Sequence, residues 1–222
     1  MKQQSEIQII YGTGNPAKLL AMKRWLEPLP VSLIGLKEAE SRLGKKAPLI
    51  EETGNNPLEN ARLKARAYYD CFKEPVFSCD SGLYLWNYET KQMLPEELQP
   101  GVCVRGRGEH RYTDEELLAY YAGLVKQYGP IMGRYQNAIS MVVSEDQYFE
   151  SEDESLWGEA FLLTDIPHGK RIPGFPIDSI SMEIESGSYY YDLKGDLQDK
   201  VAARDGFQKF IENIVNTTVF SR

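Results

Sequence analysis

The stretch IQIIYGTGNPAKLLAMKRWL, residues 7–26, decides the fold class of this 222-residue chain. Its first five residues, Ile7–Tyr11, form a short β-branched and aromatic run, which predicts a buried strand. Glycines at positions 12 and 14 interrupt the run, and a helix with a partly apolar face is predicted from Pro16 to Leu26. A strand, a Gly-rich turn and a helix in this order indicate the start of an α/β fold.

The next segments continue the alternation of strand and helix. Residues 31–36 predict a second strand, whereas the polar residues 37–55 are predicted to be mostly loop. Asn56 suits an N-cap and Pro57 the first helical position, so a helix is predicted to run to about Phe72. Residues 75–79 predict a strand that ends at Asp80, and residues 83–86 predict a separate short strand.

The second half of the chain favours consecutive strands. Thr113 and Glu116 have the spacing of a capping box, which predicts the start of a helix. Three antiparallel strands and a closing helix are then predicted over residues 135–143, 147–151, 156–163 and 201–215. Alternating elements followed by consecutive strands indicate an α/β protein with a mixed sheet.

Composition and charge narrow the class of function. The net charge is −8, which argues against a broad nucleic-acid surface but leaves room for a small anionic ligand. Three cysteines, Cys71, Cys79 and Cys103, lack the spacing of a disulfide framework or a zinc site and predict reduced thiols in a cytoplasmic protein. The polar N-terminus does not resemble a signal peptide, and no apolar run is long enough to predict a membrane span.

The turn Thr13-Gly14-Asn15 with Lys18 is a candidate phosphate site. A glycine turn lets backbone N–H groups approach an oxyanion, and the helix N-terminus adds about half a positive charge. Lys18 lies one turn into the predicted helix and can reach the same phosphate. The alternative is an ordinary strand-turn-helix with a surface lysine, because the spacing of a P-loop or dinucleotide fingerprint is absent.

Two further segments carry carboxylates. Glu51 and Glu52 lie on a predicted loop, where hard oxygen ligands suit magnesium, and Asn60 and Lys64 share a face of the following helix. Asp80, in Ser78-Cys79-Asp80-Ser81-Gly82, is expected at a strand end and can hold magnesium or accept a proton from water. The alternatives are a solvated acidic loop before a capped helix, and a simple polar turn.

The segment Gly174–Asp178 offers groups suited to a base. Phe175 can stack on a base, and the Asp178 carboxylate can accept hydrogen bonds from a base edge. The alternative is a Pro-rich turn with the Phe175 ring tucked into the core.

Taken in order, these motifs resemble the inosine triphosphate pyrophosphatase (Ham1-like) family, whose members remove deaminated purine nucleotides. The chain is identified as a divergent member over most of its length. The pieces that carry the resemblance are Thr13 to Lys18, Glu51 to Gly54, Glu59 to Ala65, Asp80 to Leu83, Pro100-Gly101, and Gly174 to Asp178.

The resemblance implies a fold, an activity and a partner. The expected fold is one domain over residues 1–222, an elongated mixed β-sheet with flanking helices and two lobes around a central cleft. The expected activity is hydrolysis of a nucleoside triphosphate such as ITP, dITP or XTP to the monophosphate and pyrophosphate, with Mg²⁺ as cofactor. The expected partners are the nucleotide and a second copy of the chain in a homodimer, with no nucleic acid and no membrane.

The resemblance also implies roles for residues. Asp80 and Lys18 are the expected catalytic groups, and Asp80 is the candidate general base. Glu51, Glu52 and Asp80 are expected to serve the metal. The residues expected to bind substrate are Thr13, Gly14, Asn15, Lys18, Lys64, Ser81, Arg105, Phe175, Asp178 and Lys200.

Three motifs depart from the family pattern. Cys79 replaces the first of two acids before Ser-Gly, and Ile177 stands where the family has tyrosine. Asp205-Gly206 follows Lys200 where the family has a His-Arg pair that reads the purine edge. The phosphate side is therefore better kept than the base side, which leaves three alternatives open. They are the same reaction on a different nucleotide, a nucleotide-binding regulatory protein without turnover, and a purely structural domain.

Overall fold

The computed structural model describes residues 7–106, 111–194 and 203–217. The chain divides into two compact units. The first unit comprises Met1–Ser81, Asn137–Leu156 and Arg204–Arg222, and the second comprises Gly82–Gln136 and Trp157–Ala203. Two long strands, β3 (Val76–Asn87) and β4 (Ile131–Ser144), contribute residues to both units. The expectation of one domain with two lobes stays a prediction.

The first strand of the first unit has a parallel neighbour on each side. Strand β1 (Ile7–Tyr11) lies between β2 (Val31–Gly35) and β3, with Tyr11 opposite Gly35 and Phe77. Strand β5 (Gln147–Ser151) pairs antiparallel with β4. The predicted strand at residues 7–11 is confirmed. As predicted it is largely buried, since its last three side chains are nearly inaccessible to solvent.

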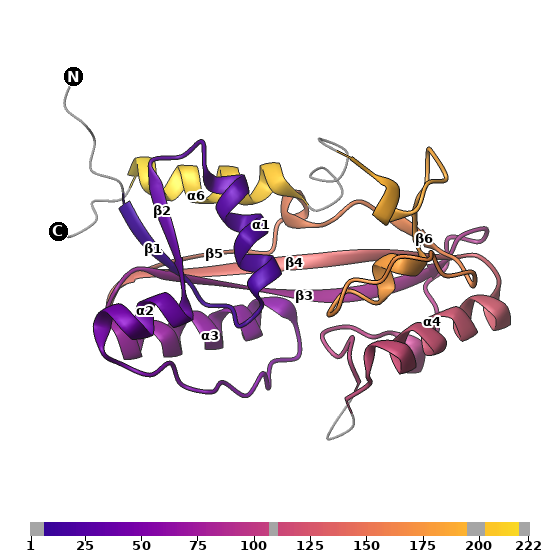
Figure 1. Cartoon of the computed structure of the whole chain (residues 1–222), viewed down its shortest axis with the longest axis horizontal. Coiled ribbons are helices and arrows are strands. Elements are labelled where there is room, and N and C mark those ends of the chain that lie inside the picture. The colour runs from indigo at the N-terminus through magenta and orange to yellow at the C-terminus, as the bar shows by residue number, and fades with distance from the viewer. Residues whose placement is uncertain (1–6, 107–110, 195–202, 218–222) are drawn as a thin grey trace. The chain divides into compact units, whose positions relative to one another are not determined.

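Helices cover both faces of the sheet in the first unit. Helices α1 (Pro16–Leu26) and α6 (Arg204–Thr217) lie on one face, and α2 (Leu36–Leu43) and α3 (Pro57–Phe72) on the other (Figure 1). Helix α3 begins where the sequence predicts, since the Asn56 side chain accepts a hydrogen bond from the Glu59 N–H. The face of α3 that meets the sheet adds Ala65, Tyr69 and Phe72 to the core.

The prediction of loop over residues 37–55 is wrong in its first part, where helix α2 forms. The segment reads as polar because Ala39 is its one buried residue among those described. Its helix is set by context: it contacts β2, and Gly44 ends it in a left-handed conformation at φ 64°. Residues 45–56 are irregular, as predicted.

The second unit has its own core around α4 (Asp114–Tyr128). Both hydrogen bonds of the predicted capping box are present, joining Thr113 and Glu116. Strands β6 (Phe161–Leu163) and β7 (Ser181–Glu183) pair antiparallel with each other, and β6 also pairs antiparallel with β4. The unit's 3₁₀ turns are η1 (Glu96–Leu98), η3 (Ile177–Ile180) and η4 (Tyr190–Asp192).

The predicted strand at residues 156–163 is wrong in its first half. Residues Glu154–Leu156 form a 3₁₀ turn, η2, and only Phe161–Leu163 pair as a strand. The Gly158 N–H instead donates a single hydrogen bond to the Tyr135 carbonyl of β4 before strand pairing begins at Phe161.

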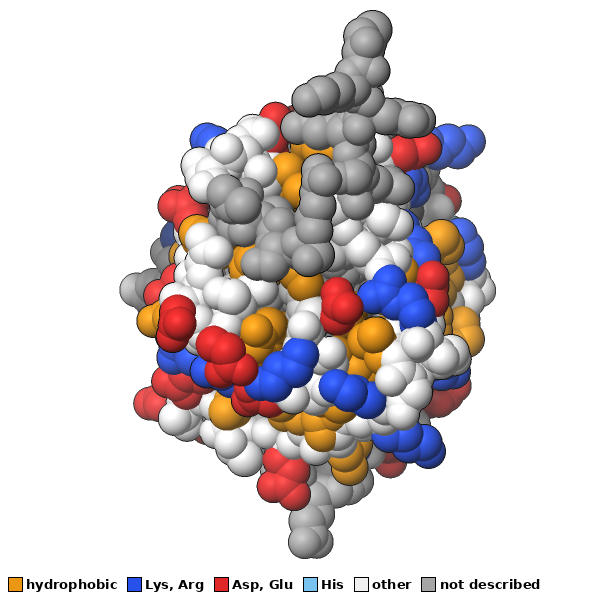
Figure 2. Space-filling model, turned by 90° about the vertical axis from the view of Figure 1, so that its left-hand side faces the viewer, with side chains coloured by type: hydrophobic (Ala, Val, Ile, Leu, Met, Phe, Trp, Pro, Cys, Tyr) orange, Lys and Arg blue, Asp and Glu red, His pale blue; other side chains and the backbone are white. Residues whose placement is uncertain are grey.

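The hydrogen-bonded order of the sheet is β2-β1-β3-β4-β6-β7, with β5 on β4. Parallel pairs at one end and antiparallel pairs at the other confirm the predicted mixed α/β class. On the face shown in Figure 2, acidic and basic side chains lie interspersed. Within the described residues, no helix combines the length and apolar character needed to cross a bilayer.

Candidate functional site

Asp80 lies in the middle of a strand, so its predicted place at a strand end is wrong. Strand β3 runs without interruption from Val76 to Asn87, and the separate strand predicted at residues 83–86 is part of it. Asp-Ser-Gly sequences disfavour strands, but β3 continues beside the long strand β4. The pairing of β3 with β1 stops at Phe77, so Asp80 lies three residues beyond the carboxyl end of β1.

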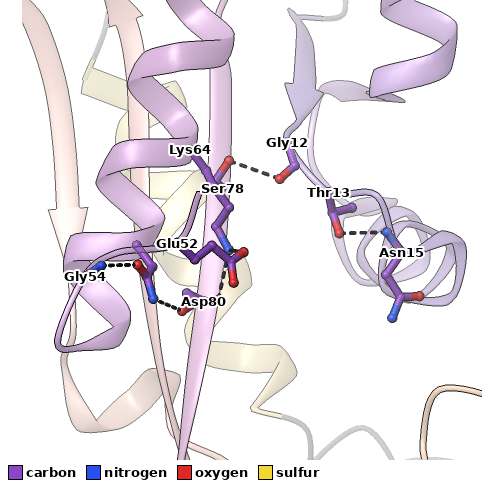
Figure 3. Close-up of polar contacts among 9 residues, drawn as sticks. Gly12, Thr13, Asn15, Glu52, Gly54, Lys64, Ser78 and Asp80 are labelled. Carbon is purple, nitrogen blue, oxygen red and sulfur yellow. Dashed lines mark hydrogen bonds and ion pairs between the residues drawn. The ribbon is translucent and has the colours of Figure 1, made fainter. Parts of the chain in front are cut away.

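Lys64 joins the two acidic motifs of the sequence. Its ammonium nitrogen lies 2.9 Å from Asp80 Oδ1 and 3.0 Å from Glu52 Oε1 (Figure 3). The side chains of Lys64 and Asp80 are 11% and 13% exposed, whereas that of Glu52 is 42% exposed. One ammonium therefore bridges a nearly buried carboxylate and a solvated one, which compensates the cost of burying the Asp80 charge.

Asn60 completes this carboxylate cluster from the same face of α3. Its Nδ2 donates to Asp80 Oδ2 at 3.0 Å, and its Oδ1 accepts from the Gly54 N–H at 2.8 Å. The residue is 2% exposed. A Cβ on Gly54 would lie 2.7 Å from Asn60 Oδ1, so glycine is needed for this close approach. The acidic loop is thereby tied to Asp80.

The electrostatics of the cluster favour ionised Lys64. Burial acts to lower the pKa of Lys64, but the Asp80 and Glu52 carboxylates outweigh it and the pKa lies above its ordinary value. Burial also raises the pKa of the neighbouring Cys79 to about 12, although the ammonium groups of Lys18 and Lys64 act in the opposite direction. Cys79 is therefore a neutral thiol at pH 7.

Lys18 belongs to the same electrostatic environment, because its charge acts on Cys79, next to Asp80. It lies in the first turns of α1, which the Asn15 side chain caps by accepting from the Ala17 and Lys18 N–H groups. Thr13 Oγ1 accepts from the Asn15 N–H at 3.1 Å. The predicted turn is thus the capped start of α1, in which Thr13 holds Asn15 and Asn15 holds the first helical N–H groups.

Gly12 fixes this turn against β3. Its N–H donates to the Phe77 carbonyl, and its own carbonyl accepts from Ser78 Oγ at 3.2 Å (Figure 3). A Cβ at Gly12 would lie 2.2 Å from Ser78 Oγ and 2.5 Å from the Tyr68 ring. The turn and the Asp80 cluster therefore share one rigid support within the first unit.

The remaining predicted residues of the first unit take less central places. Glu51 is exposed, and Ser81 is partly buried on β3. Glu59 serves the helix start, since its carboxylate accepts from the Asn55 N–H and from Asn56 Nδ2. Among the described residues, no three His, Cys, Asp or Glu side chains converge as a metal-binding group.

In the second unit, Arg105, Phe175 and Asp178 line one small pocket. Its volume is about 60 Å³. The rest of the predicted segment, Gly174, Pro176 and Ile177, also lines the pocket, and three residues that sequence reasoning missed complete its walls, namely Val104, Leu117 and Tyr135. Tyr135 carried no sequence signal beyond its place in a predicted strand. The three predicted residues are therefore brought together, although 70 positions separate Arg105 from Phe175.

Asp178 is partly buried, and no basic side chain among the described residues forms an ion pair with its carboxylate. Its pKa rises from the ordinary 3.8 to about 6 because burial disfavours the carboxylate. Burial likewise raises the pKa of Tyr135 and Tyr190, and the Asp178 charge adds to both effects. Among the described residues, no partner meets the buried Tyr190 hydroxyl. Asp178 thus changes charge close to neutral pH.

The closing helix explains what replaces the family's His-Arg pair. The Asp205 side chain is 83% exposed and bonds to Arg204. A Cβ on Gly206 would lie 1.9 Å from the Ser155 carbonyl oxygen, so this position packs against η2. Neither residue offers a side chain to a ligand in the manner of His-Arg. The predicted substrate contact Lys200 lies outside the described residues.

These features define a class of protein: a mixed α/β fold with an Asp-Lys-Glu cluster beside a capped glycine turn and a separate aromatic pocket. The model of the Ham1 family matches residues 9–143. The chain belongs to the Ham1 family.

Individual relatives agree with this assignment. The dITP/XTP pyrophosphatase of Bacillus subtilis is 28% identical over 201 residues, covering 89% of this chain and 91% of that protein. A shorter match, 36% identical over 77 residues, covers 35% of this chain and 34% of the dITP/XTP pyrophosphatase of Aquifex aeolicus. The structure of a HAM1 protein from Coxiella burnetii superposes with a TM-score of 0.68 at 20% identity, covering 96% of this chain and all of that one. That structural likeness supports the fold.

Proposed function

We propose that the chain hydrolyses a nucleoside triphosphate of a deaminated purine, such as ITP, dITP or XTP, to the monophosphate and pyrophosphate. The relatives named dITP/XTP pyrophosphatase support the substrate class. The observation that carries the proposal is the Asp80 carboxylate, held by Lys64 and Asn60 beside the turn at Thr13. Such a reaction needs an activated water and neutralised phosphate charge, which positioning and electrostatics supply.

Asp80 is the general base in this proposal. Lys64 and Asn60 each donate one hydrogen bond to a different carboxylate oxygen, so the orientation of the group is fixed. A carboxylate oxygen has two acceptor sites, and each therefore keeps one for a water molecule. Asp80 takes the proton of that water while Lys64 keeps the cluster's charge balanced.

The turn from Thr13 to Lys18 binds the phosphates. The start of α1 supplies positive potential, and the Lys18 ammonium adds a full charge next to the Asp80 cluster. Asn15 already accepts from two N–H groups of the helix, so its role is to hold the turn in shape and to offer its amide nitrogen. Among the described residues, no atom lies within 4 Å of a Cβ position at Gly14, which leaves space beside the turn for a ligand.

The acidic groups fit magnesium bound largely through water and phosphate. Magnesium in nucleotide sites takes one or two protein carboxylates and keeps several waters. Asp80 and Glu52 supply two carboxylates at one ammonium, and Glu51 is exposed on the same loop. When bound there, magnesium supplies neutralisation of the phosphate charge. The neutral Cys79 thiol contributes no hard oxygen ligand, so the protein's share is smaller than the family pattern implies.

The second-unit pocket holds the base in this proposal. Phe175 offers a ring face, the Asp178 carboxyl offers hydrogen bonds to the base edge, and Arg105 adds positive charge. Ser81 and Lys200 complete the substrate contacts by family resemblance. Because Asp205 and Gly206 do not provide a His-Arg pair, discrimination among bases falls to this pocket.

Pyrophosphate release from a panel of nucleoside triphosphates, with and without magnesium, tests the proposal. We expect magnesium-dependent release from ITP and XTP and little from ATP, GTP, CTP or UTP. Release from a different nucleotide would keep the reaction and change the substrate. Absence of release, with a nucleotide still raising the melting temperature, would favour a binding protein without turnover.

We further propose a homodimer that works in the cytoplasm. Family resemblance supports the dimer, and the free Cys71, Cys79 and Cys103 support a reducing compartment. Sedimentation velocity at micromolar concentration is expected to give about twice the 25.3 kDa chain mass. A single species at the chain mass would contradict the dimer.

A further inference from the structure

One carboxylate in the second unit joins two loops that line the aromatic pocket. Asp114 Oδ1 accepts from Arg105 Nη2 at 2.8 Å, and Asp114 Oδ2 accepts from the Gly174 N–H at 2.8 Å. Arg105 and Gly174 both line the pocket, but they lie 69 positions apart in the sequence. Asp114 thus connects the start of α4 to both loops, using each of its oxygens once.

Helix capping does not explain this arrangement. The start of α4 is already satisfied by the reciprocal bonds between Thr113 and Glu116. The Asp114 carboxylate therefore takes no part in the capping box and instead contacts the two loops. The Gly174 N–H, followed by the Arg105 guanidinium, lowers the pKa of Asp114, so the carboxylate is ionised at neutral pH.

Each partner needs an external constraint to hold its place. Gly174 has a φ of 86°, a conformation that glycine adopts readily but other residues rarely do. The carbonyl of the following Phe175 accepts a hydrogen bond from the Tyr191 hydroxyl. Arg105 has a long side chain, and its fork is oriented only when a planar acceptor meets it. Its guanidinium pairs with the Asp114 carboxylate at 2.8 Å.

We propose that Asp114 is a positioning residue that sets base selectivity by fixing the Arg105 guanidinium and the Gly174-Phe175 turn around the pocket. The inference rests on the proposed function, because it takes the pocket as the site of the base. Without Asp114, the Gly174 N–H beside Phe175 loses its acceptor and the guanidinium is free to pair with Asp178. Either change alters the groups that a base meets, whereas the Asp80 cluster keeps its own contacts.

The test compares Asp114→Ala and Asp114→Asn with the matched control Glu115→Gln. Glu115 is exposed in the same first turn of α4, so its substitution removes the same charge from the helix start. The readouts are KM and kcat for ITP and GTP, and the affinity for inosine 5′-monophosphate by titration calorimetry. Circular dichroism and melting temperature establish that each variant folds.

Asp114→Ala is expected to weaken inosine monophosphate binding and to lower the ITP-to-GTP selectivity by about tenfold, with kcat for ITP within about twofold. Asp114→Asn is expected to lie between, because its carboxamide oxygen still accepts from the Gly174 N–H. Glu115→Gln is expected to match the wild type.

Two results separate this inference from the proposed function. Wild-type selectivity and monophosphate affinity in a folded but less stable Asp114→Ala would show a merely structural role and overturn the inference. A wild type that releases no pyrophosphate, yet binds inosine monophosphate more tightly than Asp114→Ala, would overturn the function and retain the positioning role of Asp114.

Discussion

The Asp80 cluster of the first unit and the aromatic pocket of the second unit differ in whether a carboxylate removed from water has polar partners. Asp80 is nearly buried but meets an ammonium and an amide, so its charge is compensated. Asp178 is partly buried without such partners among the described residues, and burial raises its pKa to about 6. The first arrangement suits a group that must stay ionised to handle phosphate chemistry. The second suits a group whose protonation state helps to recognise a base.

The largest expected effect comes from removing the charge of the compensated carboxylate. Asp80→Asn is expected to lower kcat by about 10²–10⁴-fold, because an amide cannot take a proton from water. Initial rates of pyrophosphate release from ITP measure the loss. Asp70→Asn, an exposed change on α3, serves as control and is expected to keep full activity. Near-normal turnover in Asp80→Asn would remove Asp80 from the role of base.

Removing the cation instead of the carboxylate should destabilise the first unit. Lys64→Met leaves Asp80 and Glu52 facing each other without an ammonium, at an expected cost of about 3 kcal/mol in the free energy of unfolding. Urea unfolding at pH 7 measures this cost. The matched change Lys73→Met removes an exposed ammonium from Asp70 and Glu145, and little change is expected. Equal stability of both variants would mean that the Lys64 bridge does not compensate burial.

Close packing at the glycine turn gives the next effect. Gly12→Ala places a methyl group against Ser78 Oγ and the Tyr68 ring, and is expected to cost about 2 kcal/mol in the free energy of unfolding. Gly14→Ala meets open space and serves as the stability control. Thermal or urea unfolding of the two variants separates them. A Gly12→Ala variant as stable as Gly14→Ala would contradict the tight contact between the turn and β3.

The raised pKa of Asp178 predicts that the free energy of unfolding depends on pH. The folded-state pKa of Asp178 lies above its ordinary value of 3.8, so its favourable contribution is present below pH 4 and is lost as pH rises through about 6. Asp178→Asn is therefore expected to stabilise the protein by about 1–2 kcal/mol at pH 8 and to have little effect at pH 4. Urea unfolding at both pH values measures this.

An exposed carboxylate provides the control for that pH dependence. Asp146→Asn, in the turn between β4 and β5, is expected to give the same stability difference at pH 4 and pH 8. A stability gain in Asp178→Asn that does not depend on pH would show that Asp178 is not buried as an uncompensated acid.

The contrast between the two regions also separates what the sequence could predict from what it could not. The four-residue spacing of Asn60 and Lys64 placed both on one helix face, and the motif order placed Asp80 with them. The sequence pattern does not show where one strand continues past the end of its neighbour. The sequence therefore predicted Asp80 at the end of its own strand, whereas it lies inside β3, beyond the end of the neighbouring β1.

The second unit shows a different limit of the sequence. The local sequence predicted the capping box at Thr113. It did not predict the hydrogen bonds of the next residue, Asp114, to the distant Arg105 and Gly174. The burial of Asp178 depends on side chains brought together from separate segments, Tyr135 and Tyr190 among them. Contacts of this kind follow from tertiary packing, which periodicity does not encode.

The position of the bond that is cleaved tests the central claim most directly. Phosphorus NMR of a reaction of the wild-type protein with ITP and magnesium identifies every phosphorus-containing product. The account predicts inosine monophosphate and pyrophosphate in equal amounts, with no inosine diphosphate at any time. Inosine diphosphate with inorganic phosphate, or unchanged ITP after prolonged incubation, would contradict it.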